Sequence, residues 1–263
     1  MADRLKDKVA LVVGAGSIGP GWGNGKATAV LLARQGAEIF AIDVNEAAAA
    51  ETRHFIEGEG GTCVTHRRDM LVAEEVEAAV GACMHRFGRI DILVNNVGGS
   101  HPGGPVDMPE EVWDRQIDYN LKTPYLGCKY AIPVMEAQGG GVFLITTSVA
   151  AFIGFPAHAL YCASKGALES LVRCLAVDHA GKVRVAGLCP GTIDTPMLAA
   201  TCEGWDKPVA ELYADVARRI PVRRLGQPID IAHAAAFLLG DESGYINGTS
   251  IVLDGGTTAL PPW

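Results

Sequence analysis

Short apolar runs alternate with longer amphipathic segments along nearly the whole chain. The short runs are apolar at successive positions, which is typical of strands buried on both faces, whereas the longer segments carry apolar residues at helical spacing. The predicted strands are Lys8–Val13, Glu38–Ile42, Thr62–His66, Ile90–Asn95, Gly141–Thr147, Val183–Cys189 and Ser250–Leu253. The predicted helices are Lys26–Gln35, Glu46–Gly58, Ala73–Phe87, Glu110–Glu136, Cys162–Ala180 and Ile229–Leu239. This alternation predicts an α/β fold, a doubly wound parallel sheet of about seven strands with helices on both faces.

The chain is expected to form a single domain over residues 1–263. Its length and its 49% content of hydrophobic residues allow one large core. No repeat, low-complexity segment or run of one charge divides the sequence.

Composition narrows the classes of partner. A formal net charge of −8 argues against a nucleic-acid partner, because phosphate binding needs clustered Lys and Arg. The amino-terminal stretch MADRLKDKVALVV offers too little apolar length for a signal peptide or a membrane span, which predicts a cytoplasmic protein that binds no membrane. Seven cysteines, with no Cys-x-x-Cys pair, indicate neither a metal site nor redox work.

A glycine-rich stretch separates the first predicted strand from the first predicted helix, where backbone N–H groups and the helix dipole favour an anion. Gly14-x-Gly16-x-x-Gly19 fits the general dinucleotide pattern. Under that interpretation the helix would include the glycines that follow Gly19, and each of them would destabilise the helix by about 1 kcal/mol relative to alanine.

The alternative interpretation, which we favour, begins the helix near Asn24, a good capping residue. Gly14 then makes the turn out of the strand, Gly23 and Gly25 allow close packing, and residues 17–22 form an inserted bulge. A merely flexible loop is the remaining alternative.

Asp43 ends the second predicted strand, eighteen residues after Gly25. An acidic side chain there accepts hydrogen bonds from the adenosine ribose hydroxyls and repels a 2′-phosphate, which favours NAD(H) over NADP(H). The alternative is a solvated carboxylate at a strand end.

Several motifs stand in one order along the chain. They are Asn95-Asn96-Val97-Gly98 at the end of the fourth strand, Tyr119-Asn120-Leu121, Ser148, Tyr161-Cys162-Ala163-Ser164-Lys165, the segment Pro190 to Met197, and Leu253-Asp254-Gly255-Gly256. Ser148 and Asn120 lie thirteen and forty-one residues before Tyr161. In order and spacing, and over nearly all of the chain, these motifs resemble the short-chain dehydrogenase/reductase family in its single-domain form. The chain departs from the family pattern at Val97, where the family has alanine, and in the inserted bulge.

The resemblance implies a Rossmann fold, an NAD cofactor and oxidation or reduction at a secondary alcohol or ketone. It implies a catalytic set of Asn120, Ser148, Tyr161 and Lys165. It implies cofactor contacts from Gly14, Gly23, Asn24, Gly25, Asp43, Asp69, Asn95, Val97, Gly98, Tyr161, Lys165, Pro190, Gly191, Ile193 and Thr195. Asp69 resembles the family's adenine-contacting aspartate, although a helix cap explains it almost as well.

The residue types support this chemistry independently. Tyr161 and Lys165 are four positions apart on a predicted helix, so they lie on one face, and a nearby cation favours the phenolate. A serine hydroxyl can hold the substrate oxygen and stabilise alkoxide charge. In oxidation, Tyr161 would then take the alcohol proton while hydride passes to C4 of NAD⁺. By resemblance, Lys165 also binds the nicotinamide ribose, and Asn120 holds a water.

The substrate pocket is expected between residues 98–105, residues 149–158 and a lid at about 195–220. Its apolar candidates are Val149, Phe152, Phe155, Met197, Leu198 and Trp205. They favour a hydrophobic, cyclic or aromatic substrate. The alternatives are a 3-oxoacyl-thioester reductase and a non-catalytic dinucleotide-binding protein on the same fold. The long helices resemble those through which family members form dimers and tetramers, so a homo-oligomer is expected.

Overall fold

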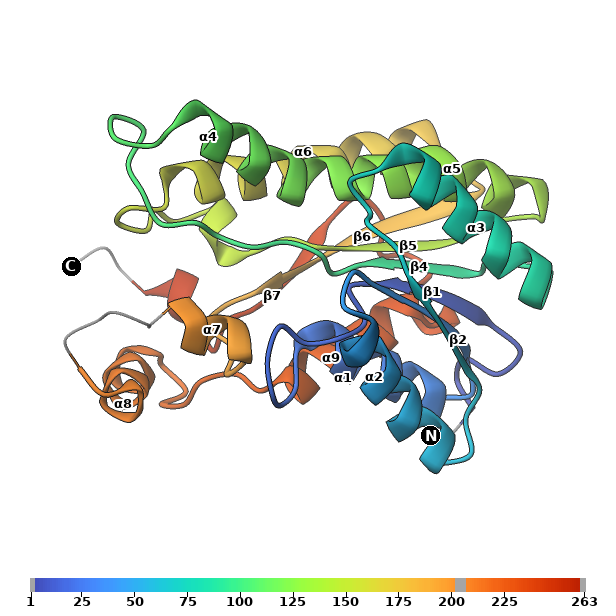
Figure 1. The fold of residues 1–263 in the computed structure, drawn as a ribbon, viewed down its shortest axis with the longest axis horizontal. Coiled ribbons are helices and arrows are strands. Elements are labelled where there is room, and N and C mark those ends of the chain that lie inside the picture. Colours follow the sequence, from blue (N-terminus) through green and yellow to red (C-terminus); the bar gives the residue numbers. More distant parts are fainter. Residues whose placement is uncertain (1–2, 202–206, 261–263) are drawn as a thin grey trace.

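Within residues 3–201 and 207–260, which the computed structural model describes, seven parallel strands form one sheet in the order β3-β2-β1-β4-β5-β6-β7 (Figure 1). The strands are β1 Val9–Val13, β2 Glu38–Asp43, β3 Cys63–Arg67, β4 Ile92–Asn95, β5 Gly141–Thr146, β6 Val183–Pro190 and β7 Ser250–Leu253. Each predicted strand is present, with ends that differ by at most two residues. The strand order reverses between β1 and β4, which is where α/β sheets of this kind bind their ligands.

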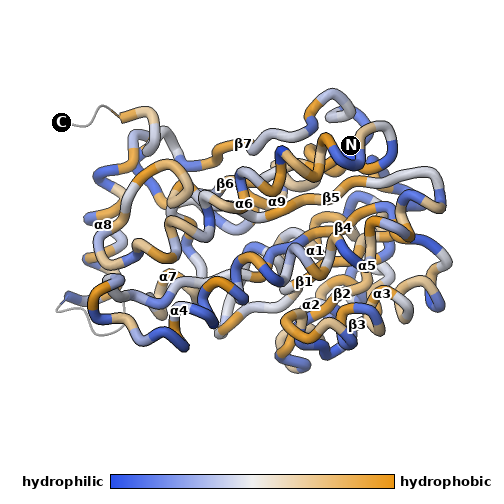
Figure 2. The backbone as a smooth tube through the Cα atoms, turned by 90° about the horizontal axis from the view of Figure 1, so that it is seen from above, coloured by the Kyte–Doolittle hydropathy of each residue, from blue (hydrophilic) through white to orange (hydrophobic). Residues whose placement is uncertain are grey.

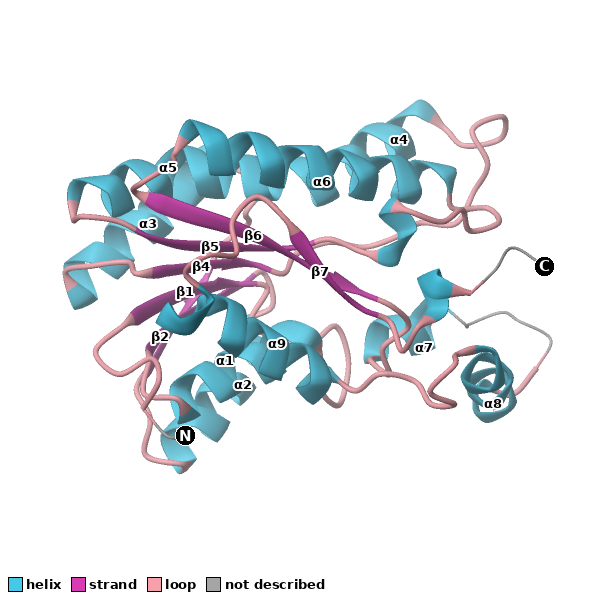
Figure 3. Ribbon diagram, turned by 180° about the vertical axis from the view of Figure 1, so that it is seen from behind, coloured by secondary structure: helices cyan, strands magenta, loops and turns pink. Residues whose placement is uncertain are grey.

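Helices cover both faces of the sheet (Figures 1 and 3). They are α1 Asn24–Arg34, α2 Glu46–Gly58, α3 Ala73–Phe87, α4 Glu110–Ile117, α5 Thr123–Ala137, α6 Ala159–Asp178, α7 Pro196–Thr201, α8 Val209–Arg219 and α9 Pro228–Leu239. Helices α1, α2 and α9 lie on one face and α3 to α6 on the other. The doubly wound α/β prediction is confirmed.

The hydrophobic core has two parts, one on each face of the sheet. In β1, Ala10 and Val12 belong to the part under α1 and α9, whereas Leu11 and Val13 belong to the part under α3, α5 and α6. Figure 2 shows the hydrophobic stretches running through the labelled strands. Because alternate residues enter different cores, a buried strand reads as a continuous apolar run.

The predicted helix Glu110–Glu136 is not uniform. A π-helical turn, Asp118–Lys122, lies between α4 and α5 and carries Asn120 at its centre. Turns of this kind occur inside α-helices, frequently at functional sites. Hydrophobic spacing did not predict it, because one widened turn barely shifts the apolar stripe.

Two helices were not predicted from the sequence. α7 and α8 follow β6 in the segment expected to form a lid, and they lie at the carboxyl edge of the sheet, at the left of Figure 1. α8 buries one side chain, Leu212. Trp205, named above as a pocket residue, is outside the described residues.

No helix in the described part of the chain combines the length and the apolar character that crossing a membrane requires.

Candidate active site

The glycine-rich turn leaves β1 as the favoured interpretation expected. Gly14 has a φ of +75°, a left-handed conformation that glycine adopts without a steric penalty. α1 begins at Asn24, and its N-cap is Gly23 without a side-chain hydrogen bond. The prediction of Asn24 as the capping residue is therefore wrong: Asn24 is the first helical residue, and its buried Oδ1 accepts no hydrogen bond from the described part of the chain.

Close packing explains the glycines that start α1. A Cβ on Gly25 would overlap the Gly14 carbonyl oxygen and lie 2.8 Å from Nδ2 of Asn96. A Cβ on Gly23 would lie 3.1 Å from the Gly16 carbonyl oxygen. The first turn of α1 thus rests directly on the backbone of the preceding turn.

A buried cation, Lys26 of α1, contacts the carboxyl-terminal end of the inserted residues 17–22. Lys26 is 1% exposed, pairs with Glu51 at 2.7 Å and donates to the Gly21 carbonyl at 3.2 Å. Its ammonium also lies 4.9 Å from the ring centre of Trp22 and 4.7 Å from that of Phe55. Trp22 therefore packs against the side of α1 and α2.

Asp43 is oriented by two backbone N–H groups. Gly16 donates to Oδ2 and Asn45 donates to Oδ1, each at 2.9 Å. A Cβ on Gly16 would lie 2.6 Å from that of Ala48, so only glycine fits where the glycine-rich turn meets the start of α2. Sequence reasoning missed Gly16, although its place in the general dinucleotide pattern was a signal. It also missed Arg67, which lies opposite Asp43 in the β2–β3 register.

The end of β4 is tied to its neighbours by asparagine side chains. Asn96 donates to the Gly14 carbonyl at 3.4 Å and accepts from Thr146 at 3.3 Å. Asn95 is buried and donates to the Val97 carbonyl at 3.4 Å. These contacts bring the carboxyl ends of β1, β4 and β5 together.

Asn120 is fully buried, and three hydrogen bonds fix its amide. Its Nδ2 donates to the carbonyls of Gly99 at 2.9 Å and Gln116 at 3.1 Å, and its Oδ1 accepts from the Gly99 N–H at 3.1 Å. Gln116 also binds this loop, since its Oε1 accepts from the His101 N–H at 2.7 Å. Sequence reasoning missed Gln116, one turn before Asn120.

Lys165 reaches the same point from α6. Its Nζ donates to the Thr146 carbonyl at 3.0 Å and lies 5.7 Å from the ring centre of Tyr161. A Cβ on Gly98 would lie 3.1 Å from this Nζ and 2.9 Å from Oδ1 of Asn120. The structure thus brings Asn120, Lys165 and Tyr161 together around a position that has room only for glycine.

Burial shifts the pKa values of Lys165 and Tyr161 in opposite directions. Burial lowers the pKa of Lys165 to about 8, while Cys189 and Glu169 act in the opposite direction. Burial also raises the pKa of the Tyr161 phenol, and a hydrogen bond with Ser148 offsets part of this rise. The pKa of Tyr161 is thus higher than normal, opposite to the direction expected from Lys165, because burial outweighs the interactions that favour the phenolate.

The segment after β6 closes the site from the other side. Gly191 has no room for a Cβ, which would lie 2.7 Å from Cα of Asp254, and Pro190 is the last residue of β6. Ile193 forms an isolated bridge with Gly226. Thr195 accepts from the Leu198 N–H at 3.3 Å at the start of α7.

Asp69 lies in the turn between β3 and α3. Its Oδ1 accepts from the Leu71 N–H at 2.9 Å, and its own N–H donates to Glu75 at 2.8 Å. The N-cap of α3 is Val72, so the interpretation of Asp69 as a helix cap is wrong.

The loops expected around the substrate meet at the carboxyl edge. Gly103 of the first loop donates to the Ala157 carbonyl of the second at 2.7 Å. A cavity of about 330 Å³ lies where the inserted loop faces α7 and α8. Its lining includes Pro20, Gly21, Trp22, Thr195, Pro196, Ala199, Tyr213 and Gln227.

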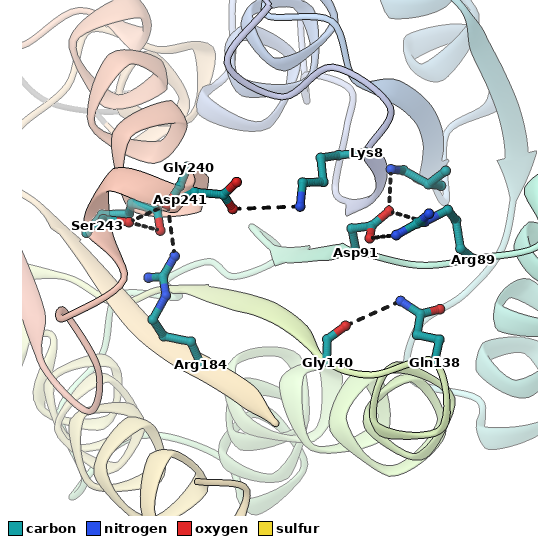
Figure 4. Close-up of polar contacts among 11 residues, drawn as sticks. Lys8, Arg89, Asp91, Gln138, Gly140, Arg184, Gly240, Asp241 and Ser243 are labelled. Carbon is teal, nitrogen blue, oxygen red and sulfur yellow. Dashed lines mark hydrogen bonds and ion pairs between the residues drawn. The ribbon is translucent and has the colours of Figure 1, made fainter. Parts of the chain in front are cut away.

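A larger cavity, of about 430 Å³, lies at the opposite edge, where β4 and β5 begin (Figure 4). Four of its charged groups form ion pairs: Arg89 binds Asp91 through two hydrogen bonds, and Lys8 lies 3.6 Å from Asp241. Arg184 donates to the Gly240 and Ile246 carbonyls, each at 3.2 Å. This cavity holds none of the catalytic candidates.

The residues at the carboxyl edge fit a dinucleotide. Gly16 and Gly25 have no space for a Cβ, so no side chain stands between a phosphate and the backbone N–H groups at these two positions of the turn. The Ser17 hydroxyl in this turn is buried and has no hydrogen-bond partner among residues 3–201 and 207–260, as a phosphate-binding group would have none before its ligand binds. The side chain of Asp43 is held at the end of β2, where the adenosine ribose of a bound dinucleotide would lie.

Comparison with known proteins agrees with this geometry. The model of a family described as "Enoyl-(Acyl carrier protein) reductase" matches residues 19–258. A 2-(R)-hydroxypropyl-CoM dehydrogenase from Xanthobacter autotrophicus is 36% identical, with 96% of this chain and 99% of the relative covered. A cyclohexanol dehydrogenase from Acinetobacter sp. is 34% identical, with 98% of both chains covered.

Solved structures resemble the whole chain. A Burkholderia xenovorans structure assigned to the short-chain dehydrogenase/reductases has a TM-score of 0.95 and 41% identity, covering 99% of this chain and all of the other. A 7 alpha-hydroxysteroid dehydrogenase complexed with NADH and 7-oxo glycochenodeoxycholic acid has a TM-score of 0.87 and 35% identity, covering 96% and 95%. The chain therefore belongs to the short-chain dehydrogenase/reductase family and is an oxidoreductase of the dehydrogenase type.

Proposed function

We propose that the chain is an NAD(H)-dependent dehydrogenase that interconverts an apolar secondary alcohol and its ketone, with Tyr161 as the acid/base. The observation that carries the proposal is the position of Lys165 and Asn120 around Gly98, together with the effect of the Ser148 hydroxyl on the pKa of Tyr161, which it lowers. A tyrosine, a serine and a lysine in this arrangement can hold a carbonyl or alcohol oxygen and move its proton.

Each side chain has a distinct task in this mechanism. Ser148 holds the substrate oxygen, and Tyr161 takes the proton of the alcohol or returns it to the ketone oxygen. Lys165 supplies the charge that stabilises the phenolate and binds the ribose, while Asn120 orders the loop and a water beside it. When bound, the nicotinamide supplies a hydride acceptor at C4.

The cofactor contacts follow the same edge of the sheet. Phosphate binding is assigned to the turn that Gly14, Gly23, Asn24 and Gly25 form, and ribose binding to Asp43. The remaining proposed contacts are Asp69, Asn95, Val97, Gly98, Pro190, Gly191, Ile193 and Thr195. A carboxylate at position 43 favours NAD(H), as does the NADH in the hydroxysteroid dehydrogenase complex.

The substrate is inferred from the pocket edge and from the relatives. Phe152 and Phe155 of the second expected loop and Met197 of α7 are exposed, and exposed apolar side chains at a binding site favour an apolar ligand. The cyclohexanol dehydrogenase supports a cyclic secondary alcohol. We infer that residues 195–220 form the lid of a single-domain, cytoplasmic enzyme.

A homo-oligomer, a dimer or a tetramer, is part of the proposal. Large side chains on α9, on the edge strand β7 and on the connection between them are exposed, including Phe237, Val252 and Tyr245. Apolar surface of this kind is commonly buried between subunits.

The test is a panel of secondary alcohols, cyclohexanol among them, offered with NAD⁺ or NADP⁺ and followed at the NADH absorbance band. Tyr161→Phe should lower turnover by about 10²–10⁴-fold, the usual contribution of acid/base catalysis, while leaving NADH binding nearly intact. Tyr125→Phe, an exposed tyrosine of α5, is the matched control and should keep turnover. Retained turnover in Tyr161→Phe would refute the acid/base assignment.

A further inference from the structure

A second buried ionisable group lies one helical turn after Lys165. Glu169 is 8% exposed and Lys165 is 3% exposed, and both belong to α6. Residues four apart on a helix lie on the same face, so both side chains extend from one side of α6, and the Glu169 charge acts on the Lys165 ammonium in a site with little access to water.

Glu169 is held by a hydroxyl from the sheet. Oγ of Ser250, the first residue of β7, donates to Oε2 of Glu169 at 2.6 Å, a distance typical of a hydroxyl that donates to a carboxylate. The other oxygen, Oε1, is buried and accepts no hydrogen bond from the described residues. Half of the carboxylate is therefore available to a positive charge beside it.

The neighbouring strand leaves room for this hydrogen bond. Gly187 of β6 lies opposite Ser250 in the sheet register. A Cβ on Gly187 would overlap the Ser250 hydroxyl and lie 2.8 Å from its Cβ. Glycine at this position thus keeps the hydroxyl where Glu169 can accept from it.

The ionisable groups around Lys165 differ in charge. Besides the Tyr161 phenol, its neighbours are the Cys189 thiol of β6 and the Glu169 carboxyl, both of which oppose the lowering of the Lys165 pKa by burial. Burial raises the pKa of Cys189 to about 12, so this thiol is neutral near neutral pH. Glu169 is therefore the neighbour that can carry a negative charge, and a buried ammonium without such a charge loses its proton easily.

We propose that Glu169 is a positioning residue for the reaction: fixed by Ser250, its carboxylate keeps the Lys165 ammonium protonated inside the buried site. The inference rests on the proposed function, in which Lys165 stabilises the Tyr161 phenolate and binds the ribose. Glu169 touches neither substrate nor cofactor and acts through Lys165.

The charge of Lys165 can be measured without nucleotide. In protein labelled with ¹³C at lysine Cε, an NMR pH titration reports each amine, and Lys165→Met identifies the Lys165 signal. Glu169→Gln should move the midpoint of that signal to lower pH by about one unit, because an opposite charge at this range favours the charged form. Ser250→Ala should move it in the same direction by less, and Glu169→Asp should lie between wild type and Glu169→Gln.

Kinetics test whether the reaction uses this charge. The pH dependence of kcat/KM for alcohol oxidation reports groups of the free enzyme. On the acidic side every variant has a protonated Lys165, so Glu169→Gln should be close to wild type. On the alkaline side its activity should fall at lower pH than in wild type, by the same shift as the NMR midpoint. Asp178→Asn, an equal charge change at an exposed site of α6, should alter neither measurement.

The outcomes separate the two proposals. An unchanged midpoint in folded Glu169→Gln overturns the inference, and so does a shifted midpoint with an unshifted alkaline limb. If Glu169→Gln fails to fold, Ser250→Ala and Glu169→Asp give the same decision. Retained turnover in Tyr161→Phe and Lys165→Met would instead refute the proposed function, while the NMR midpoint would still decide whether Glu169 controls the charge of Lys165.

Discussion

Gly25 offers the sharpest test of how the glycine-rich turn supports both the fold and cofactor binding. It is the second residue of α1, and a Cβ there would overlap the Gly14 carbonyl oxygen. The same Cβ would lie 2.8 Å from Nδ2 of Asn96 and 2.9 Å from the carbonyl carbon of Gly14. These neighbours are backbone or hydrogen-bonded groups, so Gly25→Ala must displace the first turn of α1 from the turn that precedes it.

The structure sets the size of the effect. Carbon atoms pack best at about 3.5–4.0 Å, so the start of α1 must move by a substantial part of an ångström or more. Overpacking of this kind costs about 1–3 kcal/mol of unfolding free energy. If the displaced turn also loses one charged hydrogen bond to a phosphate, worth about 1.5–3 kcal/mol, NADH binding should weaken by about 10–100-fold.

Gly81→Ala is the matched control. Gly81 lies inside α3, and a Cβ there would meet no atom within 4 Å. The change should stabilise the protein by up to about 1 kcal/mol through helix propensity and leave NADH binding unaltered. Urea unfolding and NADH fluorescence titration measure both effects. Equal stability and equal NADH affinity in Gly25→Ala and Gly81→Ala would refute the close-packing argument.

Two further substitutions test the outer parts of the site. Asp43→Ala should weaken NAD⁺ binding by about tenfold, through loss of a charged acceptor, and raise the use of NADP⁺, because Arg67 lies opposite this position; kcat/KM for the two cofactors measures this, and an unchanged preference would contradict the ribose assignment. Lys26→Met should keep the packing against Trp22 and Phe55 but lose the bonds to Glu51 and the Gly21 carbonyl. Amide exchange in residues 17–22 should then accelerate, and unchanged protection would show that Lys26 does not hold the inserted loop.

The glycine-rich turn shows which parts of the site can be predicted from local sequence. The cost of several glycines in one helix was enough to place the start of α1 after the inserted residues, and the structure begins α1 at Asn24. The same reasoning assigned the cap to the wrong residue, because a cap depends on where a side chain points. The course of the inserted loop depended on Lys26 and Phe55, whose contacts with Trp22 no local rule predicts.

The catalytic candidates show a similar division. The four-residue spacing of Tyr161 and Lys165 predicted a shared helix face, and α6 carries both. The spacing could not show that Lys165 donates to the Thr146 carbonyl, or that burial raises the pKa of Tyr161. Both facts depend on what surrounds the helix.

By itself, the sequence determined the strands, most of the helices and the glycine turn, because hydrophobic periodicity records which faces of a segment are buried. Only the tertiary structure decided the widened turn at Asn120, the orientation of Asp43 by Gly16, and the hydrogen bond between Ser250 and Glu169. These features join residues far apart in the chain, and periodicity records that a side chain is buried without recording which partner it meets.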